Sequence, residues 1–157
     1  MLSIARHTDY AARLVLHLAA VDGDAQVSIR EVAEARAMPL PFVRRLVGSL
    51  VKAGILKTVR GASGGLRLAR PANEISLLDI VEAMEGRIAL NRCTHGGKGC
   101  PLASRCPIQG VWCEADRALR ESLAASRFDL LARNTPGHAL AHRALHPAPA
   151  RRRVACA

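Results

Sequence analysis

The chain has 157 residues, of which 50% are hydrophobic and only 3% aromatic. Ala, Leu, Val and Ile must therefore fill the core, which favours a mainly α-helical fold over a β-sandwich or barrel. No run reaches the apolar length of a membrane span, and the N-terminus lacks the pattern of a secretory signal. We expect a cytoplasmic protein without membrane attachment, whose five cysteines stay reduced and need a role other than disulfides.

The net charge of +10 is unevenly distributed along the chain. Residues 1–72 carry eleven Lys or Arg against five Asp or Glu, and residues 135–157 carry four Arg and no acidic residue. Residues 73–134 are balanced, with eight of each sign. A basic first half points to a polyanionic partner, with nucleic acid ahead of an anionic membrane. From charge alone, a basic surface that is merely solvated remains the alternative.

Three helices are predicted in the first half of the chain. Residues 8–21 place apolar side chains at steps of three and four. Ser28 and Glu31 form a capping box that opens a short second helix, and a turn over 37–41 leads to a third helix that ends at Gly54. The third helix turns one apolar set inward: Val43, Leu46, Val47 and Leu50.

A hairpin is predicted after the third helix. Residues 55–60 are short and β-leaning, residues 66–70 alternate apolar and basic side chains, and a glycine-rich turn over 61–65 separates them. Three helices followed by such a hairpin are the layout of a winged helix-turn-helix DNA-binding domain. In this layout the second helix of the pair enters the major groove, and the wing reaches the backbone or minor groove.

Basic and small residues of this unit are the candidate contacts to a double-stranded DNA operator. The outer face of the third helix carries cations, and the wing glycines let the backbone approach phosphate while Arg60 enters a narrowed minor groove. The candidate contacts are Ser28, Pro41, Arg44, Arg45, Lys52, Arg60, Gly61, Ser63, Gly64 and Arg67. The alternative is an ordinary three-helix domain with solvated basic residues, but charge, element order and wing together favour DNA binding.

The second half of the chain changes character after one more helix, which covers 77–85 and is capped by Ser76. A stretch rich in Gly, Pro and Cys then excludes regular helix, and a long apolar helix follows that needs another chain to pack against. We therefore predict a DNA-binding domain at 1–86, a cysteine loop at 87–107, a dimerisation helix at 108–134 and a disordered basic tail at 135–157.

The cysteine loop contains Cys93, Cys100 and Cys106. Three thiols in a glycine-rich loop can converge on one centre, because the loop has no hydrogen-bond ladder to preserve. Their spacing is not the paired Cys-x-x-Cys of zinc ribbons, and three thiolates with one weaker ligand suit an iron–sulfur cluster. From spacing alone, an iron–sulfur cluster and a zinc site carry similar weight, and free buried thiols are the remaining alternative.

From Thr8 to about Leu131 the chain resembles the IscR, NsrR and RirA family of bacterial transcription regulators. The resemblance is carried by the cysteine loop and by a long and specific wing motif at residues 59–68. Three shorter motifs, at residues 8–11, 50–56 and 75–81, match as well. It implies a homodimer in which the long C-terminal helix crosses between subunits. It also implies a 4Fe-4S or 2Fe-2S cluster in the cysteine loop that responds to nitric oxide, iron or cluster supply.

Asp9 matches the position at which NsrR-like proteins supply an aspartate ligand from the partner subunit, so it is the candidate fourth metal ligand. A helix N-terminal acid that interacts with the helix dipole is the alternative role. Gln109 stands where the IscR pattern has a histidine, and the step from Cys100 to Pro101 is closer to RirA-like proteins. His95 and Cys113 are further candidate ligands, although a buried apolar role is expected for Cys113.

The sequence thus predicts a repressor that senses nitric oxide or iron and cluster status through an iron–sulfur cluster. The alternative is a zinc-bound or cluster-free winged-helix regulator without redox sensing. An enzyme is not expected, because the chain has no phosphate loop, no nucleophile elbow and no substrate-sized second domain. A cluster bound across the dimer would fix the spacing of the two recognition helices and so control operator affinity.

Overall fold

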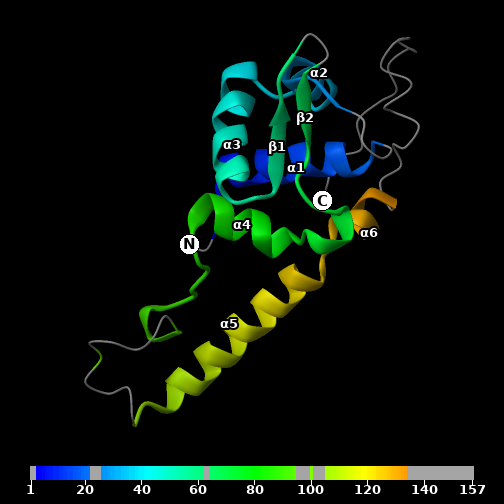
Figure 1. The fold of residues 1–157 in the computed structure, drawn as a ribbon. Coiled ribbons are helices and arrows are strands. Elements are labelled where there is room, and N and C mark those ends of the chain that lie inside the picture. The colour runs from blue at the N-terminus through cyan, green and yellow to red at the C-terminus, as the bar shows by residue number, and fades with distance from the viewer. Residues whose placement is uncertain (1–2, 22–25, 62–63, 95–99, 101–104, 134–157) are drawn as a thin grey trace, which may run out of the picture.

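The computed structural model describes residues 3–21, 26–61, 64–94, 100 and 105–133. The chain is mainly helical with one two-stranded antiparallel sheet, and the order of its elements confirms the predicted winged helix-turn-helix fold (Figure 1). The predicted basic tail, Ser63 and His95 lie outside the described residues.

The predicted DNA-binding unit begins with three helices, α1 (Arg6–Ala19), α2 (Ile29–Ala35) and α3 (Leu40–Lys52). The apolar positions that the sequence places at helical spacing are buried between them, so burial of these faces holds the bundle together. The most deeply buried side chains of the three helices are Leu14, Val15, Val32, Val43, Leu46 and Leu50.

At the start of α2 the structure shows one of the two hydrogen bonds of the predicted capping box, and the start of α3 differs slightly from the prediction. The Oγ atom of Ser28 accepts a 3.1 Å hydrogen bond from the amide of Glu31, and Ser28 itself remains exposed. The predicted turn over 37–41 is shorter than expected, because α3 already begins at Leu40. Pro41 is tolerated there because the amide groups of a first helical turn have no partner within the helix.

Gly54 ends α3 and redirects the chain into the hairpin. Its φ of 68° lies in the left-handed region, where glycine is favoured. The amide of Gly54 donates to Val51 O at 3.0 Å, and the amide of Ile55 donates to Leu50 O at 2.9 Å. These two bonds form a Schellman motif, which confirms the predicted end of the helix.

The wing is the antiparallel pair β1 (Leu56–Val59) and β2 (Gly65–Leu68), with Leu56 opposite Leu68 and Val59 opposite Gly65. Val27, just before α2, extends this sheet by a bridge to Leu66, with N···O distances of 3.1 and 2.8 Å. The root of the wing is therefore bonded to the segment that leads into the helix-turn-helix.

The expectation of one uninterrupted helix over 108–134 is wrong. Two helices occupy this stretch, α5 (Pro107–Ala125) and α6 (Phe128–Arg133). Between them the chain runs beside residues 75–77: Leu77 N donates to Ser126 O at 2.9 Å, and Phe128 N donates to Ile75 O at 3.0 Å. The Phe128 side chain is 1% exposed in the core, and α6 packs against α1. The last helix thus belongs to the DNA-binding body.

The arrangement in space separates this body from α5. Figure 1 shows α4 (Leu77–Glu85) crossing beneath the other helices and the sheet. It also shows α5 beginning at a point far from them and running toward α4 and α6. Two short 3₁₀ turns, η1 (Ala72–Glu74) and η2 (Arg92–Thr94), precede α4 and α5 respectively. The cysteine segment lies between α4 and α5.

Candidate nucleic-acid interface and cysteine segment

The face of α3 opposite the core carries the predicted DNA contacts, and the structure leaves all four exposed: Pro41, Arg44, Arg45 and Lys52. The guanidinium carbon of Arg45 lies 5.9 Å from the ring centroid of Phe42. The Phe42 ring meets Tyr10 of α1 edge-on, with centroids 6.2 Å apart. The cation–π contact with Phe42 restricts Arg45 before any ligand arrives, which lowers the entropy cost of a phosphate contact.

The wing residues differ in how far they reach into solvent. Arg60 and Gly61 are exposed beyond the end of β1, whereas Gly64 is half-buried. The amide of Gly64 donates to Gly61 O at 2.9 Å across the turn. The described part of the wing thus presents Arg60 beside an exposed backbone, as a minor-groove or phosphate contact requires.

Arg67 lies lower on the wing than the sequence implies. It is half-buried, and it pairs across the strands with Lys57. Both side chains line a cavity of about 420 Å³ between the end of α1 and the base of the wing. Arg67 is therefore less accessible to DNA than Arg60, although both were predicted as contacts.

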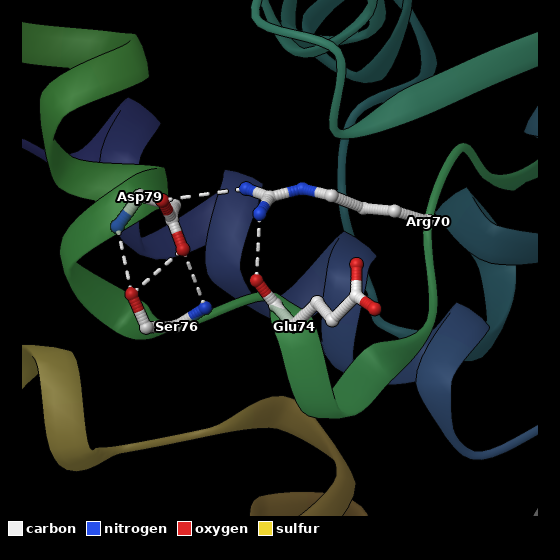
Figure 2. Close-up of polar contacts among 4 residues, drawn as sticks. All are labelled: Arg70, Glu74, Ser76 and Asp79. Atoms are coloured by element: carbon white, nitrogen blue, oxygen red, sulfur yellow. Dashed lines mark hydrogen bonds and ion pairs between the residues drawn. The ribbon is translucent and has the colours of Figure 1, made fainter.

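The base of the wing is fixed to α4 by Arg70, which contacts the predicted Ser76 cap through Asp79 (Figure 2). Arg70 donates to Glu74 O at 2.7 Å and forms a 3.3 Å ion pair with Asp79 Oδ1. Asp79 also accepts from the amide and hydroxyl of Ser76, both at 2.7 Å, and its own amide donates to Ser76 Oγ at 3.2 Å. This capping box begins α4, so the wing and α4 are held in one orientation.

The same contacts change the acidity of Asp79. Burial by itself raises the pKa of the carboxyl, but the hydrogen bonds from Ser76 and the charge of Arg70 outweigh burial and hold the pKa below its ordinary value. The carboxylate therefore stays ionised well into the acidic range, and the link between wing and α4 stays intact with it.

The predicted cysteine ligands occupy both ends of one segment. Cys93 lies in η2 and Cys106 at the N-cap of α5, both half-buried, and Cys100 between them is exposed. All three are free thiols. Within the described part of the chain, however, no three His, Cys, Asp or Glu side chains lie close enough together to hold a metal ion.

Asp9 is placed in the first turn of α1, as predicted. Within one chain its carboxylate forms a 2.8 Å ion pair with Arg13, one turn further along, and both side chains are about half exposed. This arrangement fits the helix-terminal role, and the carboxylate is also accessible to a second subunit.

The Cys113 thiol, for which a buried role was predicted, is exposed on α5 in a single copy of the chain. The neighbouring apolar side chains on this helix are exposed as well, at 59% for Ile108, 66% for Val111 and 41% for Trp112. Within the described part of one chain these side chains stay exposed, so their burial would need a further surface such as a second copy.

Two buried or half-buried polar centres were missed by sequence reasoning. Asp116 of α5 is 8% exposed and accepts a hydrogen bond from the amide of Leu90. His17 of α1 is 6% exposed, and its Nδ1 accepts from Nε of Arg36 at 3.3 Å. The polar positions of His17 and Asp116 within otherwise apolar helix faces were the available signals.

Among the described helices, none is long and apolar enough to cross a membrane.

Residues 4–134 match the family described as "Rrf2: Iron-dependent Transcriptional regulator". Protein aau3 of Rhizobium meliloti is 34% identical over 134 residues, which cover 85% of this chain and 86% of that protein. The HTH-type transcriptional regulator NsrR of Geobacillus kaustophilus is 32% identical over 133 residues, covering 83% and 90%. The structure of CymR (YrzC), described as the global cysteine regulator of B. subtilis, superimposes with a TM-score of 0.72 at 27% identity, covering 86% and 99%.

Proposed function

The chain belongs to the Rrf2 family of DNA-binding transcriptional regulators and is not an enzyme, and from this premise we propose that it is a homodimeric repressor that senses nitric oxide or iron status through an iron–sulfur cluster. The observation that carries the DNA-binding part is the geometry of α3 and the wing. Both present exposed arginines, and both are rigidly attached to one core. Such a unit places a helix in the major groove and a hairpin against the backbone.

The homodimer is supported by the exposed apolar residues of α5. Ile108, Val111 and Trp112 follow the three- and four-residue spacing of one helix face, and each is more than one third exposed. Apolar side chains gathered on a helix that extends from the body are typical of an interface, because burying them against a second copy removes them from water. Two copies joined through α5 would place two α3 helices on one operator.

The cluster is supported by the chemistry of the donor set. Cys93, Cys100 and Cys106 supply three free thiols, and two of them sit half-buried at the ends of one segment, where access by water is limited. Asp9 of a second subunit is the proposed fourth ligand. When bound, such a cluster would supply a centre that reacts with nitric oxide. Under iron limitation the cluster would not be assembled.

The chain's own residues would convert that chemistry into DNA affinity. The three thiolates would bind the cluster and so hold Cys93, Cys100 and Cys106 together, and α5 would pack against the second subunit. If Asp9 bridges to the partner's cysteine segment, the start of α1 is fixed as well, and with it the spacing of the α3 helices. Loss of the ligand set releases these restraints and lowers operator affinity.

A second candidate function is a winged-helix regulator that holds zinc, or no metal, and senses nothing through the cysteines. Its metal-free form is favoured by one observation: the described residues bring no three ligands together. A structural zinc site needs four ligands in tetrahedral geometry, so zinc would need one ligand besides the three loop cysteines.

One anaerobic experiment separates these functions. Protein purified without oxygen is analysed for iron, sulfide and zinc, and its operator affinity is measured before and after addition of nitric oxide. We expect visible iron–sulfur absorbance, equal amounts of iron and sulfide, and weaker DNA binding after nitric oxide. Alanine in place of Cys93, Cys100 or Cys106 should abolish the absorbance. Colourless protein that contains zinc, or a DNA affinity that nitric oxide does not change, would contradict the proposed cluster sensing and favour the second candidate function.

A further inference from the structure

Every residue of α5 lies in the described part of the chain, and among them Asp116 is the one that is buried, at 8% exposed. The other side chains of this helix are half or fully exposed, and a carboxylate is rarely the buried side chain of such a helix. Burying a carboxylate without hydrogen bonds is strongly unfavourable. Its partners therefore explain its position.

The partners of Asp116 all belong to the segment that carries Cys93. Oδ1 of Asp116 accepts from the amide of Leu90 at 2.9 Å and from the hydroxyl of Thr94 at 3.3 Å. The single proton of the Thr94 hydroxyl is shared with Asn91 O, which lies closer at 2.8 Å, and the Thr94 amide donates to the same oxygen at 3.1 Å. Residues 91–94 thus form a closed turn, and Asp116 holds both the entry and the exit of that turn.

From this geometry we propose that Asp116 is a positioning residue that fixes the Cys93 thiol relative to α5. The inference rests on the proposed function, because it gives Cys93 the role of a cluster ligand. Cys93 lies inside the turn, directly before Thr94, so its thiol has the position that the bonds to Asp116 impose. Asp116 contacts no ligand atom itself and acts through the backbone of the turn.

The same level of α5 is tied to the DNA-binding body. Arg120 follows Asp116 by one helical turn, and its Nη1 forms a 2.5 Å ion pair with Glu82 Oε1 of α4. The Arg120 and Glu82 side chains are 26% and 33% exposed, so solvent screens this pair less than a surface pair. A displacement of the Cys93 turn would therefore displace α5 near Asp116, one helical turn from the Arg120–Glu82 ion pair that holds α5 against α4.

The test uses the full-length protein freed of metal, so that it does not depend on cluster loading. Hydrogen exchange at the Leu90 amide and the alkylation rate of Cys93 are measured in wild type and in Asp116→Ala, Asp116→Asn and Glu121→Gln. We expect Asp116→Ala to speed exchange at Leu90 about tenfold, since a hydrogen bond to a charged group is removed, and to speed alkylation of Cys93. Asp116→Asn keeps the acceptor oxygen and should restore most of the protection. Glu121→Gln changes an exposed carboxylate of the same helix and should leave both rates unchanged.

The second measurement loads the cluster and follows its loss to a chelator under anaerobic conditions. Asp116→Ala should lose iron several-fold faster than wild type, and Thr94→Val, which removes one bond with little change in volume, should fall between them. Unchanged exchange at Leu90 and unchanged alkylation in Asp116→Ala would overturn the positioning role. If Asp116→Ala fails to fold, the exchange rate at Leu90 and the alkylation rate of Cys93 are compared between wild type, Thr94→Val and Asp116→Asn instead. A wild-type protein that takes up no cluster, with the exchange differences still present, would sink the proposed sensing function and leave Asp116 as the residue that positions Cys93.

Discussion

The hydroxyl of Thr8 donates a 2.6 Å hydrogen bond to Oε1 of Glu85, and so joins the first turn of α1 to the last residue of α4, 77 positions away. The same oxygen accepts from the amide of Ala5 at 3.0 Å. Ala5 occupies the N-cap position of α1 and has no polar side chain, so Glu85 supplies the cap from another helix. These bonds, that of Thr8 first, hold the pKa of Glu85 below its ordinary value although partial burial opposes them.

Glu85→Ala should destabilise the fold. It removes the cap of α1 and leaves the hydroxyl of Thr8, which is 1% exposed, without its acceptor. We expect the free energy of unfolding to fall by about 1–2 kcal/mol, measured by urea denaturation of the apo protein at neutral pH. Glu74→Ala is the matched control, because the exposed Glu74 uses its backbone oxygen and not its carboxylate for bonding (Figure 2). Equal stability of the two variants would show that Glu85 is not a working cap.

His17 should make the fold sensitive to mildly acidic pH. Burial lowers its pKa, the charge of Arg36 lowers it further, and Glu31 only partly opposes them. When the pH drops below 6.5, the ordinary pKa of histidine, His17 becomes protonated in the unfolded chain but stays neutral in the folded chain. The free energy of unfolding therefore falls as the pH drops below 6.5. One such group changes stability by at most about 1.4 kcal/mol for each pH unit.

Urea denaturation at pH 7.5, 6.5 and 5.5 measures this effect, because ordinary carboxylates stay ionised throughout that range. The His17→Gln variant keeps an acceptor for Arg36 but does not titrate. It should therefore show a flatter dependence on pH than wild type. Parallel curves for the two proteins would mean that His17 does not control the acid response.

Gly65→Ala should displace the wing. A Cβ atom at this position would lie 2.7 Å from Val27 O, and a backbone oxygen in a bridge can move only by breaking its bond to Leu66. We expect a decrease of about 1–3 kcal/mol in the free energy of unfolding and weaker operator binding. Gly48→Ala is the stability control, since a Cβ there meets nothing within 4 Å and alanine favours helix. Normal stability of Gly65→Ala would contradict the close packing of Val27 on the wing.

Operator binding should depend on salt through individual arginines. Removing one arginine–phosphate interaction lowers the slope of log affinity against log salt by about 0.9, because fewer counterions are released on binding. Arg44→Ala and Arg60→Ala should both weaken binding and reduce this slope while leaving the unfolding curve unchanged. Arg133→Ala removes a 74% exposed arginine of α6 and serves as the control for net charge. A salt slope for Arg60→Ala equal to that of Arg133→Ala would remove the wing tip from the DNA interface.

Features set by residues close together in the chain were predictable from the sequence. The Ser76 cap, the Gly54 helix end and the glycine turn of the wing depend on neighbours within six residues, and each has a residue type that the geometry requires. The exposed cations of α3 follow in turn, because a helix with one apolar face must turn its charged residues outward.

Features set by distant partners were not predictable. The apolar spacing continues past residue 125, so nothing local marks the end of α5; the break depends on Leu77 and Ile75 bonding to the chain at Ser126 and Phe128. The hydrogen bonds made by the carboxylates of Glu85 and Asp116 likewise need partners tens of residues away. The burial expected for Cys113 assumed a partner that one chain does not contain.

Asp9 is the residue for which the structural and functional roles make opposite predictions. As a helix-terminal acid it interacts with the dipole of α1 and with Arg13 at 2.8 Å, and both side chains are about half exposed. Such exposed pairs contribute about 0.2–0.5 kcal/mol, so in this role Asp9→Ala would cost a little stability and nothing else. As a cluster ligand from the second subunit, it would matter to the cluster far more than to the fold.

Asp9→Ala should therefore keep an iron–sulfur cluster with altered absorbance, react faster with nitric oxide, and couple that reaction less strongly to DNA release. The physical reason is that a carboxylate oxygen is a harder ligand than a thiolate and shields one iron site while leaving it exchangeable. Stopped-flow absorbance and operator titration before and after nitric oxide measure the two effects. Arg13→Ala breaks the same ion pair without removing a ligand, so it is the matched control, and it should leave the spectrum unchanged. If Asp9→Ala and Arg13→Ala behave alike, Asp9 is a helix-terminal acid, and the fourth ligand must be sought at the exposed thiol of Cys113 or at His95.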